Sequence, residues 1–471
     1  MRGKTKTFLL TAAALSSLAA TGAKAQSADE TAFRGLYKEL VEINTTASVG
    51  SCTAAAEAMG ARLKAAGFPD GDVRVLAPPE HPKFGALVAT LRGKDPKAGA
   101  ILLLAHIDVV EAKREDWVRD PFKLVEEDGY FYARGASDDK AMAAIFTDSL
   151  VRYKKEGFQP KRDLKLALTC GEEGGPFNSV PWLLEKYPET LKADFALNEG
   201  DDSQLDEKGQ PRLLGIQVGE KVYMDYDLEV TNAGGHSSRP VKDNAIYHLA
   251  GGLARLGAYD FPIALNEATK GYYEQNAKIE PDPEVAAAMR AMVKNPGDAA
   301  AAAVLARDPG RNSMMRTTCV ATMVEAGHAP NALPQRAKAN VNCRILPGND
   351  PKVVRDQLET IVADPAIKIT LAAAPDPVSP PPPLTPRIMA PAAKVAGKIW
   401  PGVPFIPAML TGATDGRFTN AAGVPTYGLS GLMAGVDGDH IHGLNERIQV
   451  KALMNGRRFL YEVVKLYADG K

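Results

Sequence analysis

The stretch ILLLAHIDVV, residues 101–110, is apolar along most of its length and becomes polar only towards its C-terminal end. Such a run is typical of a strand buried on both faces of a sheet. LKLALTC at 164–170 is a second run of this kind, and DKAMAAIFTDSLVRYKKEG at 139–157 has the spacing of an amphipathic helix. Strands that alternate with helices predict an α/β fold, with a mixed, mostly parallel sheet flanked by helices.

Polar residues gather where these predicted strands end, which is where open α/β sheets bind ligands. Glu172 and Glu173 follow the second strand, and two like charges in a half-buried loop repel unless cations hold them. Each cluster also has a purely structural interpretation as a polar strand end or a helix N-cap. Histidine and carboxylate are zinc ligands, so the clusters together predict a metal site. The clusters are His106-Ile107-Asp108, Asp138-Asp139, Glu172-Glu173, Asn198-Glu199 and His440-Ile441-His442.

The middle of the chain follows a different pattern. Residues 221–232 alternate as a half-buried strand does, 244–259 have helical spacing, and 316–346 read as two antiparallel strands, which predicts an α+β domain. A proline-rich connector, PDPVSPPPPLTP at 375–386, follows. A chain of 471 residues is expected to hold more than one domain. We therefore expect a catalytic domain split into 26–218 and 375–471, with the α+β domain inserted at 219–374.

The N-terminus has the composition of a signal peptide. Basic residues precede an apolar stretch at 8–20, and Ala23-Lys24-Ala25 has the small-x-small pattern of a cleavage site. The apolar stretch is shorter than the ~20 residues that cross a bilayer, so we expect removal of 1–25 and a secreted or periplasmic protein without a membrane span. Losing its four cations changes the net charge from -1 to -5, which argues against nucleic acid binding. These cations are Arg2, Lys4, Lys6 and Lys24.

The four cysteines form no C-x-x-C pair that would indicate a structural zinc site. An exported protein can oxidise them to disulfides. Cys319 and Cys343 fall at facing positions of two predicted strands joined by a turn near Asn331, so this pair is the preferred disulfide. The redox state of Cys52 and Cys170 stays open.

Eight short motifs occur in a characteristic order along the chain. They resemble the signature of the aminoacylase, glutamate carboxypeptidase and carnosine-type dipeptidase family of two-metal peptidases, over nearly the whole mature chain. The resemblance implies that the inserted domain is ferredoxin-like and serves as a lid and dimerisation unit. The motifs are HIDVV (106–110), GASDDK (135–140), GEEG (171–174), NEG (198–200), GGHSSRP (234–240), PNALP (330–334), GATDGR (412–417) and HGLNE (442–446).

The resemblance implies a cage for two divalent metal ions. In it, His106 and Glu199 would bind one ion, Glu173 and His442 the other, and Asp138 would bridge the two. Asp108 would support His106, and Glu172 would be the general base for a water between the ions. His440 is an alternative ligand, but the spacing to Asn445-Glu446 favours His442. Zinc is the first choice, and manganese or cobalt would also suit these ligands. The peptide bond between Asp138 and Asp139 is often cis in such relatives.

The substrate is less sharply defined than the metal cage. The resemblance implies that His236 reaches the active site of a second subunit, which predicts a homodimer through 219–374. Asn331, Arg344 and Thr414 match positions that hold substrate, and Arg344 could grip a free α-carboxylate through two parallel bonds.

Three functions remain in competition. The leading expectation is hydrolysis of dipeptides or of C-terminal residues of short peptides. The alternative is release of an amino acid from an N-acyl group, because GATDGR is nearer the aminoacylase pattern. A non-catalytic peptide-binding protein on the same scaffold is the third, and the presence of Glu172 and all five ligands argues against it. A serine hydrolase is disfavoured because no G-x-S-x-G motif occurs.

Overall fold

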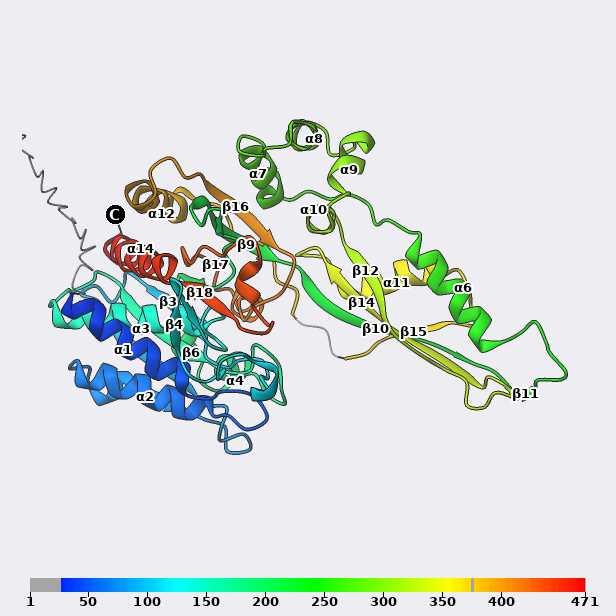
Figure 1. Cartoon of the computed structure of the whole chain (residues 1–471), viewed down its shortest axis with the longest axis horizontal. Coiled ribbons are helices and arrows are strands. Elements are labelled where there is room, and N and C mark those ends of the chain that lie inside the picture. The colour runs from blue at the N-terminus through cyan, green and yellow to red at the C-terminus, as the bar shows by residue number, and fades with distance from the viewer. Residues whose placement is uncertain (1–26, 374–376, 471) are drawn as a thin grey trace, which may run out of the picture.

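The computed structural model describes residues 27–373 and 377–470, so the predicted signal peptide lies outside the described residues. The molecule is elongated: a large sheet wrapped in helices forms one end, and a smaller sheet extends from it (Figure 1). Within the described ranges, no helix combines the length and the apolar character that crossing a membrane requires.

The large sheet has nine strands, and its centre is parallel. β3 (Ala100–His106) pairs in parallel with β6 (Asp163–Thr169) on one side and β7 (Phe195–Asn198) on the other. β3 ends at His106, earlier than the predicted 110, so Asp108 lies beyond the strand. The remaining strands are β1 (Val73–Leu76), β2 (Ala86–Leu91), β8 (Gln204–Leu205), β9 (Pro211–Glu220), β16 (Phe405–Leu410) and β17 (Thr426–Gly428).

Helices cover both faces of this sheet, which confirms the predicted α/β architecture. Alternate β3 residues enter two different apolar clusters: Ile101 and Leu103 face one, and Leu102 and Leu104 face the other. This two-sided burial explains the unbroken apolar run in the sequence. The first face carries α1 (Ala28–Glu42), α2 (Cys52–Ala65), α3 (Lys140–Lys155), α12 (Pro386–Ile399) and α14 (Val450–Asp469), and the second carries α4 (Ser179–Lys186), α5 (Pro188–Leu191) and α13 (Gly416–Ala421).

The smaller sheet is antiparallel and has its own apolar cluster on one face. Along β10 and β14, buried residues alternate with half-buried or exposed ones, as predicted for an α+β unit. The helices α6 (Ala245–Gly257) and α11 (Pro351–Val362) cover the buried face. The strands in order are β12 (Thr318–Ala326), β14 (Arg336–Ile345), β10 (Val222–Thr231) and β15 (Lys368–Leu371).

Four helices between α6 and β12 pack with the core of the large sheet, although they belong to the interval 219–374. They are α7 (Glu267–Asn276), α8 (Pro283–Lys294), α9 (Ala299–Leu305) and α10 (Pro309–Met315). The limits 26–218, 219–374 and 375–471 therefore remain proposed domain boundaries. Short pairings complete the fold: β11 (Gly235–His236) with β13 (Ala332–Leu333), and β5 (Tyr130–Tyr132) with both β4 (Val125–Glu127) and β18 (Arg447–Gln449).

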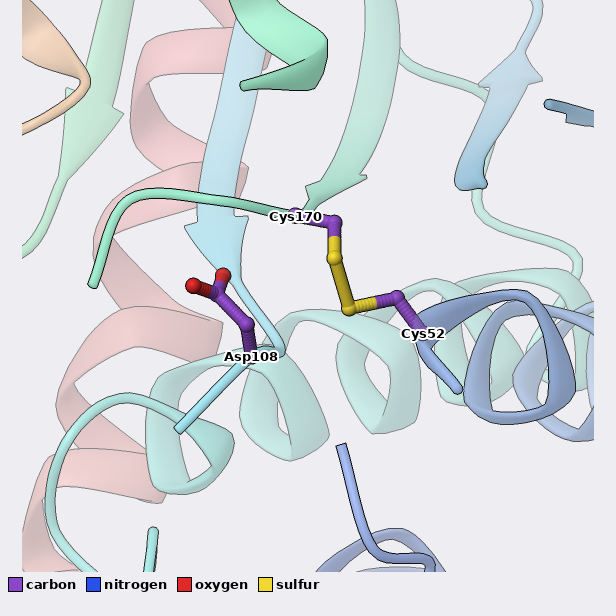
Figure 2. A group of neighbouring side chains, drawn as sticks. All are labelled: Cys52, Asp108 and Cys170. Atoms are coloured by element: carbon purple, nitrogen blue, oxygen red, sulfur yellow. A yellow bond between two sulfur atoms is a disulfide. The ribbon is translucent and has the colours of Figure 1, made fainter. Parts of the chain in front are cut away.

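Both pairs of cysteines form disulfides. Cys319 and Cys343 face each other in the antiparallel register of β12 and β14 and are bonded, which confirms the predicted pair. Cys52 and Cys170 form the second bond, which joins the start of α2 to the residue after β6, with Asp108 beside it (Figure 2). This bond anchors the chain two residues before Glu172.

Candidate metal centre

The predicted site residues meet at the carboxyl edge of the central strands. Because β3 and β6 are parallel and in register, His106 lies opposite Thr169, and the Glu172-Glu173 pair follows a few residues later. β7 ends at Asn198 on the other side of β3, and Glu199 comes next. The sheet thus places one histidine and three carboxylates along one edge.

Five side chains form two groups that share one carboxylate. His106 Nε2 lies 3.0 Å from Asp138 Oδ1 and 3.6 Å from Glu199 Oε1. His442 Nε2 lies 3.1 Å from Asp138 Oδ2 and 2.8 Å from Glu173 Oε2. The two oxygens of Asp138 therefore face different histidines. The peptide bond from Asp138 to Asp139 is cis, as the resemblance implied.

The raised pKa values of the histidines in this cluster indicate an environment that favours cations. Hydrogen bonds that the His442 ring donates to the carboxylates of Asp138 and Glu173 raise the pKa of His442 to about 10. Burial opposes a charged His106 ring, but the carboxylates around it, above all Glu199, outweigh burial and raise its pKa well above the ordinary value. Burial raises the pKa of Glu199 to about 7. The same carboxylates that favour positively charged imidazoles would favour divalent cations, whose binding would displace the imidazole protons.

The donor set fits divalent metal ions. Ligand atoms of His106, Asp138 and Glu173 lie within 4.8 Å of one another, and so do those of His106, Asp139 and Glu199. Imidazole nitrogen and carboxylate oxygen are ligands that zinc accepts. Three carboxylates, those of Asp138, Glu173 and Glu199, would oppose the four positive charges that two ions bring.

Asp108 supports two residues of the cage, not one. His106 Nδ1 lies 3.1 Å from the Asp108 main-chain oxygen, and the nearer carboxylate oxygen is 3.6 Å away. The other carboxylate oxygen accepts a hydrogen bond from the Glu173 main-chain nitrogen at 3.0 Å. Asp108 thereby links the loop after β3 to the loop after β6.

Glu172 lies beside the cage without belonging to either group of contacts. Its side chain is 12% exposed, and Arg417 Nη1 lies 3.8 Å from its Oε1. Burial and the charge of Glu199 raise the pKa of Glu172 well above its ordinary value. A half-buried carboxylate with a raised pKa beside a group of potential metal ligands is suited to accept a proton, as a general base must.

A buried ion pair that the sequence did not indicate connects two of the ligand loops. Arg134 Nη1 donates to Glu446 Oε2 at 2.8 Å, and its Nη2 donates to the main-chain oxygen of Gly443 at 2.9 Å. Glu446 also accepts hydrogen bonds from the main-chain nitrogens of Gly135, Ser137 and Asp138. The pair therefore fixes the loop that carries Asp138 against the loop that carries His442.

The loop with His442 has an unusual backbone, which this ion pair helps to maintain. Asp439, His440, His442 and Asn445 all have positive φ, a region that residues other than glycine rarely adopt. His440 turns away from the cage: its Nδ1 lies 3.1 Å from the main-chain oxygen of Leu444, and its Nε2 lies 3.3 Å from Asp437. His442, not His440, contacts the cage.

The predicted substrate residues are divided between the two sheets. Thr414 is 3% exposed and lines the cavity at the cage. Arg344 lies on β14, with its guanidinium 4.7 Å from the centre of the Tyr223 ring. His236 lies in β11, which pairs with β13, and Asn331 directly precedes β13 and accepts a hydrogen bond from the Ser237 main-chain nitrogen; β11 lies at the end of the smaller sheet farthest from the large sheet (Figure 1). The structure does not bring these two residues to the cage of their own chain.

Comparisons with known proteins agree with this geometry. Residues 102–466 match the model of peptidase family M20/M25/M40. The N-fatty-acyl-amino acid synthase/hydrolase PM20D1 of Homo sapiens is 30% identical over 394 residues, which cover 80% of this chain and 76% of that protein. Aminoacylase-1 of Sus scrofa is 27% identical over 69% of this chain and 68% of its own length.

Solved structures show the same fold. The M20 family metallo-carboxypeptidase Sso-CP2 from Sulfolobus solfataricus superposes with a TM-score of 0.69 at 21% identity, over 94% of this chain and all of that one. Family match and sequence relatives together identify the chain as a member of peptidase family M20/M25/M40, a metallohydrolase of amide or peptide bonds.

Proposed function

We propose that this chain hydrolyses N-acyl amino acids that carry an apolar acyl group. The observation that supports this most directly is the cavity at the cage. Its volume is about 660 Å³, and Asp138, Glu172, Glu199 and His442 line it. The rest of its wall combines apolar side chains with polar and charged ones such as Asp202, Gln204 and Arg212; the apolar ones include Leu205, Leu410, Leu432, Ala434, Val436 and Ile441. A cavity of this size and character suits an acyl chain next to the reacting amide.

The names of the relatives support the same substrate class, since two of them are an N-fatty-acyl-amino acid synthase/hydrolase and an aminoacylase. Dipeptide hydrolysis is the second candidate, and one residue favours it. The carboxylate of Asp202 also lines the cavity, where it could pair with the free ammonium group of a dipeptide. The sequence favoured dipeptide hydrolysis over hydrolysis of N-acyl amino acids. We reverse this order, because the apolar side chains of the wall offer more surface to an acyl chain than to a charged N-terminus.

The proposed roles follow from the positions of the side chains. His106, Asp138, Glu173, Glu199 and His442 would hold two divalent ions, with zinc as first choice, and these would polarise the scissile carbonyl and acidify a water. Glu172 would take the proton of the attacking water and deliver it to the leaving amine. Thr414, held on the cavity wall, would contact the substrate near the reacting carbonyl, and Arg344 would bind the free carboxylate.

The proposal is tested by a series of N-acyl leucines of increasing acyl length, with leucyl-leucine alongside, using the metal-loaded mature chain. Released leucine is measured. We expect kcat/KM to rise by up to about fourfold per buried methylene, because each contributes ~0.8 kcal/mol. Leu432→Asp should weaken the rise of kcat/KM with acyl length. Val353→Asp, at an exposed valine on α11, should leave this rise unchanged. Faster cleavage of leucyl-leucine than of every acyl leucine would refute this substrate class.

We also propose that the protein is exported and dimeric. Two disulfides are typical of an oxidising compartment, which agrees with the predicted signal peptide. β12 is an edge strand of the smaller sheet, and Val320, Met323 and Val324 on it are 60%, 70% and 62% exposed. An exposed apolar edge strand is a template for pairing with a second chain. Pairing through β12 would bury these side chains and leave His236 free to act on the partner.

Met323→Glu is expected to convert the dimer into a monomer, because it places a charge in the proposed interface. Light scattering after gel filtration measures the mass. Activity should fall along with dimerisation, since His236 would no longer reach a second active site. Val353→Glu, which adds the same charge outside the interface, is the control. A monomeric wild type, or a fully active Met323→Glu monomer, would contradict the proposal.

A further inference from the structure

Two charged residues stand where the chain passes from the large sheet to the small one. β9, in the large sheet, ends at Glu220, and β10, in the small sheet, begins at Val222. Lys221 alone separates these two strands. Glu220 is 3% exposed and Lys221 is fully buried. Burying a charge is costly unless polar groups surround it, so the contacts of each side chain show what holds it there.

Glu220 contacts the wall of the catalytic cavity. Its Oε2 accepts hydrogen bonds from the Thr414 main-chain nitrogen and from the Thr414 hydroxyl, both at 2.8 Å. The Thr414 hydroxyl in turn accepts a hydrogen bond from Asn198 Nδ2 at 3.0 Å, and Asn198 precedes the cage residue Glu199. Hydrogen bonds therefore lead from Glu220 through Thr414 to the strand end that carries Glu199.

Lys221 contacts a different part of the chain. Its Nζ donates to the main-chain oxygens of Ser313 and Arg316, at 2.9 and 2.8 Å, and lies 3.2 Å from Thr318 Oγ1. These residues connect α10 to β12, so the ammonium group ties together two passages of the chain between the sheets. Thr318 is paired with Arg344 in the register of β12 and β14. Lys221 thus holds the start of the strand that pairs with Arg344.

We propose that Glu220 and Lys221 are positioning residues for the reaction. Glu220 fixes Thr414, and Lys221 fixes the start of β12, which pairs with the strand of Arg344. The peptide bond between Glu220 and Lys221 then sets the distance between the two proposed substrate contacts, Thr414 and Arg344. Side chains of consecutive extended residues point in opposite directions, so the adjacent residues Glu220 and Lys221 can contact the large-sheet part and the small-sheet part of the chain, respectively. The inference rests on the proposed substrate roles of Thr414 and Arg344.

The test compares Glu220→Leu and Lys221→Met in the full mature chain. Hydrogen exchange should become faster in peptides covering 412–417 for Glu220→Leu and in peptides covering 313–318 for Lys221→Met. Glu220→Leu should lower kcat about tenfold or more, the scale of one lost hydrogen bond to a charged group. Lys221→Met should instead raise KM about tenfold for an N-acyl amino acid, with little change for the matching carboxamide, which lacks the carboxylate.

Matched variants separate positioning from a general loss of stability. Lys165 also donates to two main-chain oxygens, those of Glu189 and Lys192, so Lys165→Met is the control and should leave KM unchanged. Glu220→Gln keeps an acceptor oxygen but loses the charge, so it should restore most of kcat. If Glu220→Leu does not fold, Glu220→Gln replaces it in the exchange test: exchange at 412–417 should still be faster than in the wild type, because a neutral acceptor binds Thr414 more weakly than a carboxylate does.

Two results would overturn the inference. One is hydrogen exchange that stays at the wild-type rate, at 412–417 in Glu220→Leu and at 313–318 in Lys221→Met. The other is a KM increase in Lys221→Met of equal size for the acid and the carboxamide. A wild type that cleaves no N-acyl amino acid would refute the proposed function instead. The exchange measurements would then still decide whether Glu220 and Lys221 hold these two segments.

Discussion

Glu172→Ala is expected to lower kcat by about 10³-fold while the metal content of the protein stays unchanged. A positioned general base contributes roughly 10² to 10⁴ to a rate, and here one carboxylate would both accept and return the proton. Glu172 is suited to this because burial raises its pKa and because it makes none of the contacts that link the histidines to the cage. The measurements are kcat at saturating substrate and metal content by mass spectrometry.

The neighbouring carboxylate provides the matched control. Glu173 Oε2 lies 2.8 Å from His442 Nε2, so Glu173→Ala should lose metal and activity together. Glu172→Ala should lose activity alone. If Glu172→Ala retains more than a tenth of the wild-type turnover, another group takes the proton and the proposed role of Glu172 is wrong.

The central strands were predictable because burial on both faces makes their consecutive residues apolar. β3 and β6 are covered by helices on both faces, so each leaves an apolar run that ends where the polar site begins. Clusters at these ends pointed to the edge where the structure brings His106, Glu173 and Glu199 together. The end of β3 was placed too late, because Ile107 and Val109 are buried after the strand has ended and therefore extend the apolar pattern.

The supports of the site were not predictable from local patterns. Arg134 and Glu446 form their ion pair across 312 positions of sequence, and Glu220 reaches Thr414 across 194. A single charged residue in a short segment carries no signal of a partner so far away. Glu446 belonged to a recognised motif, but that motif indicated no role for it beyond its spacing to His442. Lys221 stood in an alternating strand pattern that predicted only a half-buried position.

The largest effect on metal binding is expected at Asp138. Its two oxygens face His106 and His442 at 3.0 and 3.1 Å, so among the five cage residues it is the one whose side chain contacts both histidines. Asp138→Asn keeps the shape of the side chain but replaces an oxygen by an amide nitrogen, which cannot bind a metal ion. We expect the variant to retain at most one ion after dialysis, against two in the wild type, and to lose more than about 10³-fold in kcat, because both ions act on the same water.

A carboxylate on the His442 loop is the control for this substitution. Asp437 pairs with Arg447 at 2.6 Å and lies outside the cage contacts, so Asp437→Asn should keep both ions and most of the activity. Chelation adds a second comparison: removing metal from the wild type should reproduce the inactivity of Asp138→Asn, and added zinc should restore only the wild type. Two tightly bound ions in Asp138→Asn would show that Asp138 does not bridge them. Since Asp139 is the adjacent carboxylate near His106 and Glu199, it would then be the bridging candidate.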